Sequence, residues 1–164
     1  MLKSNLKIAF VALSIPILIL SQAEANNKGK LPKDAVALSV EEVKAIFAGK
    51  TFTYSPVPTI YFSPDGTLSG FENYKGQEHI MDGTWTASGN ESCRTMNIHG
   101  SDKSKNMQIV ECRKFYKVGK VVYDEYTKGW PELMGNVNKD YDKLGKAGDA
   151  ASIQVDALHK KFGY

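Results

Sequence analysis

Cysteine and histidine are scarce in this sequence: among 164 residues there are two cysteines and three histidines. The cysteines form no C-x-x-C pair, and no histidine stands at zinc-finger spacing from them, so the residues predict neither a zinc site nor a redox motif. Phosphate loops, dinucleotide fingerprints, nucleophile elbows and H-E-x-x-H motifs are also absent. We therefore expect a protein that is not an enzyme and that uses no metal or cofactor.

Isolated polar residues do not change this expectation. The histidines, His79, His99 and His159, are far apart in the chain, and we interpret each as a solvated surface side chain because metal sites need convergent ligands. Oxygen ligands for Ca²⁺ are offered by one group of residues, which lacks the glycine and the distal glutamate of an EF-hand loop. This group is Asn136, Asn138, Asp140 and Asp142.

Charge of one sign is not in excess. The 21 basic and 18 acidic residues give a net charge of +3, and they are scattered along the chain. A nucleic-acid partner is therefore not expected. A composition of 42% hydrophobic and 24% charged residues is typical of a globular domain and excludes collagen, coiled coil and wholesale disorder.

A long hydrophobic run occurs once, at the N-terminus. Lys3 and Lys7 precede the apolar run Ile8–Leu20, and the small residues of Ala23–Ala25 follow it. This pattern predicts a secretory signal peptide that is cleaved after residue 25. The alternative, a membrane anchor, needs about 20 apolar residues, and Pro16 interrupts the run. We therefore predict a periplasmic or secreted protein with no stable membrane anchor after cleavage.

The two cysteines fit an oxidising compartment, where an even pair most often forms a disulfide. The segments that contain Cys93 and Cys112 flank a polar loop, Gly100–Lys105. Antiparallel pairing with His99 opposite Asn106 places the cysteines opposite each other. The same register aligns three more compatible pairs, which are Arg94 with Glu111, Met96 with Ile109, and Ile98 with Met107. A slip by one residue would destroy all four pairs, so we predict this hairpin and this disulfide.

Further strand signals lie on both sides of the hairpin. Segments rich in β-branched and aromatic residues are typical of strands; they are Thr51–Tyr54, Thr59–Phe62, Thr67–Glu72, Gly83–Ala87, Tyr116–Val118 and Val121–Tyr123. Turn residues occupy Ser63–Gly66, Ser88–Asn90 and Gly119–Lys120. The spacing predicts a mainly β (α+β) fold, in which an antiparallel meander closes into a small barrel or sandwich.

Two helices are expected around the sheet. Ser39 and Glu42 have the spacing of a capping box, and Gly49 ends the helix that follows. Near the C-terminus a second helix places Ala151, Val155, Leu158 and Phe162 on one face. Residues 127–148, with four glycines, are expected to be mostly loop. The predicted organisation is a signal peptide (1–25), a flexible N-terminal segment (26–35), a β-barrel-like domain (36–138), and a C-terminal loop and helix (139–164).

Several short motifs occur in an order that resembles a known family. They are Leu38–Val43, Gly49–Thr51, Tyr61–Thr67, Gly83–Trp85, Cys93, Cys112 and Gly135–Asn136. The chain resembles a group of small exported proteobacterial proteins of unknown function over about residues 36–138. This resemblance implies a lipocalin-like β fold with a helix, a strand meander, a G-x-W strand and two cysteines. It implies no activity, ligand or functional residues.

The aromatic residues on the expected strands allow three interpretations. They fill a barrel core, they line a cleft for an apolar or glycan ligand, or they form an exposed protein-binding patch. The candidate ligand-binding residues are Tyr54, Phe62, Trp85 and Tyr123.

Two functions remain open. The first is a non-enzymatic module of the bacterial periplasm or exterior that binds an unknown small molecule or protein. The alternative is an exported hydrolase inhibitor or a stress-linked interaction protein. A cavity of roughly 300 Å³ lined by the aromatics would favour a small ligand. An exposed segment at residues 26–33 without such a cavity would favour the alternative.

Overall fold

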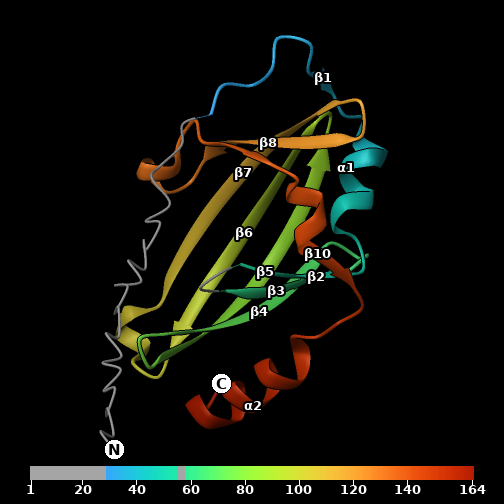
Figure 1. The fold of residues 1–164 in the computed structure, drawn as a ribbon. Coiled ribbons are helices and arrows are strands. Elements are labelled where there is room, and N and C mark those ends of the chain that lie inside the picture. Colours follow the sequence, from blue (N-terminus) through green and yellow to red (C-terminus); the bar gives the residue numbers. More distant parts are fainter. Residues whose placement is uncertain (1–28, 55–57) are drawn as a thin grey trace, which may run out of the picture.

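The structure, a computed structural model, describes residues 29–54 and 58–164. The predicted signal peptide, residues 1–25, and residues 26–28 lie outside this part of the chain. Ten strands form one antiparallel sheet that curls into a half-barrel (Figure 1). Its strand order is β10-β2-β3-β4-β5-β6-β7-β8-β9, and β1 pairs with β7 beside this path. The expected mainly β antiparallel meander is thus confirmed.

The strands are β1 (Val36–Ala37), β2 (Lys50–Thr53), β3 (Thr59–Phe62), β4 (Thr67–Tyr74), β5 (Gln77–Ser88), β6 (Glu91–Gly100), β7 (Met107–Val118), β8 (Val121–Lys128), β9 (Val137–Lys139) and β10 (Gly145–Ala147). The α-helices are α1 (Val40–Phe47) and α2 (Ser152–Phe162). Three short 3₁₀ turns are η1 (Lys103–Lys105), η2 (Pro131–Leu133) and η3 (Tyr141–Leu144). Among the described residues, no helix has the length and the apolar character needed to cross a membrane.

The pairing of β6 with β7 has the register that the sequence predicts. Cys93 lies opposite Cys112 and the two form a disulfide. The other three predicted pairs are also present: Arg94 with Glu111, Met96 with Ile109, and Ile98 with Met107. Because side chains alternate between the faces of a strand, Arg94 and Met96 point to the face opposite the disulfide.

Helix α1 fills the concave side of the half-barrel. Its N-cap Ser39 accepts a hydrogen bond from the backbone of Glu42, whose side chain accepts one from Ser39, so the predicted capping box is confirmed. The ring of Phe47 lies 4.9 to 6.1 Å, between centroids, from five other aromatic rings of the core. These rings belong to Phe52, Phe62, Trp85, Phe115 and Tyr141. The sheet and α1 therefore share one aromatic core.

Helix α2 packs on the other face of the sheet, where Val155 and Leu158 bury Ile80. Polar contacts surround this small apolar contact: His159 Nε2 lies 2.9 Å from Asp82 Oδ2, and Lys161 pairs with Glu78.

The histidines, which we expect to be solvated surface side chains, keep part of their surface exposed, and tertiary packing also gives each a partner. All three are partly buried. His159 faces Asp82, His79 Nδ1 lies 2.9 Å from Glu72 Oε1, and the ring of His99 lies 5.1 Å from that of Tyr164.

The expectation of loop for residues 127–148 is wrong in two places. Strand β9 pairs with β8, and β10 pairs with β2, so this segment supplies both edges of the sheet. Between them, η3 places Tyr141 in the aromatic core. The glycines that suggested a loop stand at turns, such as Gly135 and Gly148 with φ of +75° and +96°. The short strands between them gain their conformation from pairing with distant strands, which local sequence does not reveal.

Removal of the disulfide should lower the free energy of unfolding by about 2 to 5 kcal/mol, because the cross-link restricts the unfolded chain. The variant is Cys93→Ser with Cys112→Ser, and the measurement is urea denaturation with and without reductant. Reductant should weaken the native protein to the level of the variant and leave the variant unchanged. Equal midpoints for the native protein in both conditions would contradict the assignment.

Candidate functional site

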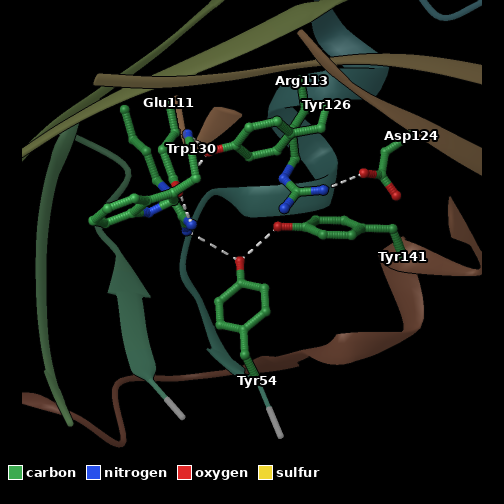
Figure 2. Close-up of polar contacts among 8 residues, drawn as sticks. Tyr54, Glu111, Arg113, Asp124, Tyr126, Trp130 and Tyr141 are labelled. Carbon is green, nitrogen blue, oxygen red and sulfur yellow. Dashed lines mark hydrogen bonds and ion pairs between the residues drawn. The ribbon is translucent and has the colours of Figure 1, made fainter. Parts of the chain in front are cut away.

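Charged and hydroxyl side chains gather inside the half-barrel, next to the aromatic core (Figure 2). We call this group the polar cluster: Tyr54, Arg94, Glu111, Arg113, Asp124, Tyr126 and Tyr141. Its members come from β6, β7, β8 and η3 and from the residue after β2. The members on β7 and β8 occupy alternate positions, Glu111 with Arg113 and Asp124 with Tyr126, and this alternation directs them inward. Asp124 is fully buried, and the side chain of Glu111 is 6% exposed.

The pair of Arg94 and Glu111 forms the first half of the cluster. Arg94 Nε donates to Glu111 Oε2 at 2.6 Å, and a terminal nitrogen of Arg94 contacts the same oxygen. Burial opposes the charge of Arg94, but its interactions with Tyr54 and Glu111 outweigh burial and raise the pKa of the guanidinium above its ordinary value. Arg94 is therefore held as a cation inside the protein.

A second ion pair, Arg113 with Asp124, forms the other half. Asn138 Nδ2 also donates to Asp124 Oδ2, at 3.1 Å. The guanidinium of Arg113 lies over two rings, 4.8 Å from the centroid of Tyr126 and 5.0 Å from that of Tyr141. Burial raises the pKa of Asp124 above its ordinary value, against the opposing effects of Arg113 and Asn138.

Two tyrosine hydroxyls join the halves. The hydroxyl oxygens of Tyr54 and Tyr141 lie 2.6 Å apart, and Arg94 donates to the Tyr54 oxygen at 3.2 Å. Burial raises the pKa of Tyr141 well above its ordinary value, so its hydroxyl stays protonated. A neutral tyrosine beside a paired arginine donates and accepts hydrogen bonds but supplies no base for catalysis.

The interior beside the polar cluster holds almost no free volume. A cavity of about 10 Å³ is lined by Phe47, Phe62, Ser92, Arg94, Glu111, Arg113 and Tyr141. This volume suits at most about one water molecule. Among the described residues, this cavity beside the polar cluster is therefore too small for a ligand.

The four candidate ligand-binding residues do not line one cleft. Phe62 and Trp85 are buried in the aromatic core, and the indole of Trp85 donates to the carbonyl of Ser63 at 2.8 Å. Tyr54 is a member of the polar cluster. Tyr123 points to the opposite face of the sheet, because its neighbour Asp124 points inward.

Two of the residues considered for Ca²⁺ have partners within the protein. Asn138 donates to Asp124, and Asp140 Oδ1 lies 2.7 Å from Lys143 Nζ. One group of possible metal ligands lies close together in the described chain: Glu91, Cys93 and Cys112. The disulfide removes both thiolates of that group.

An exposed loop is attached to the polar cluster through Tyr126. We call residues Gly129–Gly135 the Trp130 loop. The Tyr126 hydroxyl donates to Glu111 Oε1 at 2.9 Å and accepts from the backbone N–H of Trp130 at 2.8 Å. At the other end of the loop, the N–H of Gly135 donates to the carbonyl of Tyr126 at 2.8 Å. One buried residue thus holds both ends of the loop.

The conformation of the Trp130 loop depends on Gly129, whose φ is +126°. A Cβ atom at this position would collide with the Tyr126 hydroxyl and with Glu111. The loop leaves Trp130 37% exposed and Met134 40% exposed. Trp130 is not among the residues that the sequence singles out, and the adjacent glycine and proline are the local signals of a turn.

Comparison with known proteins gives one family. A model of the DUF995 family, described as proteins of unknown function, matches residues 14–135. No curated protein and no solved structure matches the chain. The matched segment includes six of the seven residues of the polar cluster and the whole Trp130 loop, whereas Tyr141 lies beyond it.

Replacing Glu111 with Ala should lower the free energy of unfolding by about 3 to 5 kcal/mol, because it leaves the charge of Arg94 buried without its partner. A variant that also carries Arg94→Met should be less destabilised than the sum of the two single variants, since the unpaired charge is gone. Urea denaturation of the four proteins of this cycle measures the coupling. Additive effects would contradict the buried pair.

The protein should lose stability in alkali through Tyr126. Burial raises the pKa of Tyr126 from 10.0 to about 12. The stabilising contribution of the neutral hydroxyl is present below pH 10, where both states keep the proton, and is lost as the pH rises through the folded pKa. Between these values it should fall by about 1.4 kcal/mol per pH unit. Chemical denaturation across this range should give a shallower slope for Tyr126→Phe, and equal slopes would contradict the shift.

Proposed function

We propose that this chain, which belongs to the DUF995 family, is an exported, non-enzymatic module that binds a partner protein through the Trp130 loop. The observation that carries the proposal is the exposed Trp130 held by a buried polar cluster, beside which the described residues leave a cavity of only about 10 Å³.

Export is supported by two independent features. The N-terminal sequence has the order of a cleaved signal peptide: basic residues, an apolar run and an A-x-A site. The disulfide between Cys93 and Cys112 requires an oxidising environment to persist. The periplasm and the cell exterior of a bacterium both provide one.

The absence of catalysis is supported by the bonding within the polar cluster. Glu111 and Asp124 are each paired with an arginine, and the hydroxyls of Tyr54 and Tyr141 are bonded to each other. General acid–base chemistry needs a titrating group that reaches a substrate. These groups bond to one another, and the cavity that the described residues leave beside them measures about 10 Å³.

A protein partner is supported by the nature of the Trp130 loop. Tryptophan and methionine are enriched at the centres of protein interfaces, and tryptophan is a frequent hot-spot residue. Tyr126 fixes both ends of the loop, so little conformational entropy is lost when a partner binds. Lys128 before the loop and Glu132 within it are exposed and provide a polar rim.

Inhibition of a hydrolase is a more specific version of this proposal, in which the partner protein is a hydrolase. Within the described part of the N-terminal segment, Gly29, Lys30 and Lys33 are exposed. This exposure, together with the filled interior, is the combination that favours an interaction protein over a carrier of a small ligand. Loss of a captured hydrolase's activity on binding would identify this form.

Trp130→Ala should weaken partner binding by about 30-fold or more, the loss expected at a hot spot, and should change the free energy of unfolding by less than about 1 kcal/mol because the indole is partly exposed. The native host would express the full chain with a photo-crosslinking amino acid at position 134. We expect one discrete cross-linked protein, which Trp130→Ala removes.

The matched control places the same crosslinker at Ile153, which is 89% exposed on α2. This position should give no discrete product. Equal products from both positions would contradict the Trp130 loop as the interface. A stoichiometric small molecule in the intact mass of protein purified from the host would contradict the filled interior. Retention of the full chain in the cytoplasm with free thiols would contradict export.

A further inference from the structure

A groove of about 410 Å³ lies between α1 and the hairpin that joins β7 to β8. Helix α1 forms one wall, and the hairpin turn with Gly119 and Lys120 forms the other. Lys50 and Asp142 also line the groove. In Figure 1, α1 lies beside the start of β8 and close to η3. The groove is at the opposite end of β8 from the Trp130 loop, so the two surfaces are separate.

The floor of the groove is apolar. Leu38 and Ile46 are each 6% exposed and belong to the aromatic core, and Val122 packs against the same core. Ala45 is exposed on the rim of α1. A floor of this kind accepts an apolar side chain, and the volume is within the range of about 300 to 1,000 Å³ that ligand sites occupy.

The rim carries two kinds of polar group. Lys117 pairs with Glu42, and Lys50 Nζ donates to the carbonyl of Ala45 at 2.6 Å. Lys120 is exposed and makes no ion pair within the described chain. The Oδ1 atom of Asp142 is buried and accepts no hydrogen bond from the residues that the structure describes. The groove therefore offers cations on its rim.

We propose that this groove binds an extended peptide segment that carries an acidic side chain next to an apolar one. The apolar side chain would cover Leu38 and Ile46, and the carboxylate would pair with Lys120. A single peptide supplies both groups, whereas a nucleic acid lacks the apolar side chain and would bring phosphates toward the carboxylate of Asp142.

The inference goes beyond the proposed function, because it concerns a second surface and a different class of contact. It is tested with two five-residue peptides that share leucine at positions 1, 3 and 5. One has aspartate and glutamate between the leucines, and the other has lysine at both places. Amide NMR spectra of the full mature chain would be recorded during titration with each peptide.

We expect the acidic peptide to give saturable shifts confined to residues 38–50 and 117–122 and to Asp142, and the basic peptide to give none there. Ala45→Glu places a carboxylate in the groove and should weaken binding about tenfold or more through like-charge repulsion. Lys120→Glu should weaken it by a similar factor. Both substitutions are at exposed positions, and circular dichroism would verify that both variants fold.

The matched control is Ala157→Glu, the same change at an exposed position of α2. This variant should bind the acidic peptide as the native chain does. Equal binding of both peptides, shifts elsewhere on the protein, or equal effects of the changes at positions 45 and 157 would overturn the proposal. A concentration-dependent dimer that Ala45→Glu disrupts would also overturn it, since the groove would then be covered by a second copy. None of these results depends on Trp130, so they leave the proposed function to its own test.

Discussion

The register between β6 and β7 is the constraint on which the rest of the structure depends. The disulfide of Cys93 and Cys112 fixes it covalently on one face of the sheet. Because side chains alternate, the next pair, Arg94 and Glu111, must then meet on the other face, inside the half-barrel. A slip by one residue would send this ion pair to solvent and the cysteines into the core. The cross-link and the buried charges thus specify the same alignment from opposite sides.

Four charges in a β interior are costly unless each has a partner, because removal from water costs several kcal/mol per ion. The polar cluster meets this cost by pairing Arg94 with Glu111 and Arg113 with Asp124, and by bridging the halves through tyrosine hydroxyls. Aromatic faces cover what remains of Arg113. Hydrophobic residues of similar volume would often give equal stability. We therefore interpret the cluster as a source of conformational specificity: it fixes the position of Tyr126 and, through Tyr126, the position of the Trp130 loop.

The sequence alone predicts the structure where the signal is local, or where one strand register places several compatible residue pairs opposite each other. Ser39 and Glu42 are three residues apart, and their capping box could be read directly. Cys93 and Cys112 could be aligned because neighbouring pairs agreed with them. The contact of Tyr54 with Tyr141, 87 residues away, leaves no such pattern. Strands β9 and β10 were missed for the same reason, since their conformation comes from distant partners.

The segment after the family match completes the interior that the match begins. The matched residues end at Gly135, yet Asn138 donates to Asp124, Tyr141 bonds to Tyr54, and β10 covers the edge of β2. Without these contacts a buried carboxylate and a tyrosine hydroxyl would lose partners, and an edge strand would be open to pairing with other chains. A relative that shares only the matched region must therefore close its half-barrel with a different segment or carry fewer charges inside it. The polar cluster depends on residues 136–148 for two of its contacts. We therefore expect substitutions in the cluster and in this segment to occur together across the family.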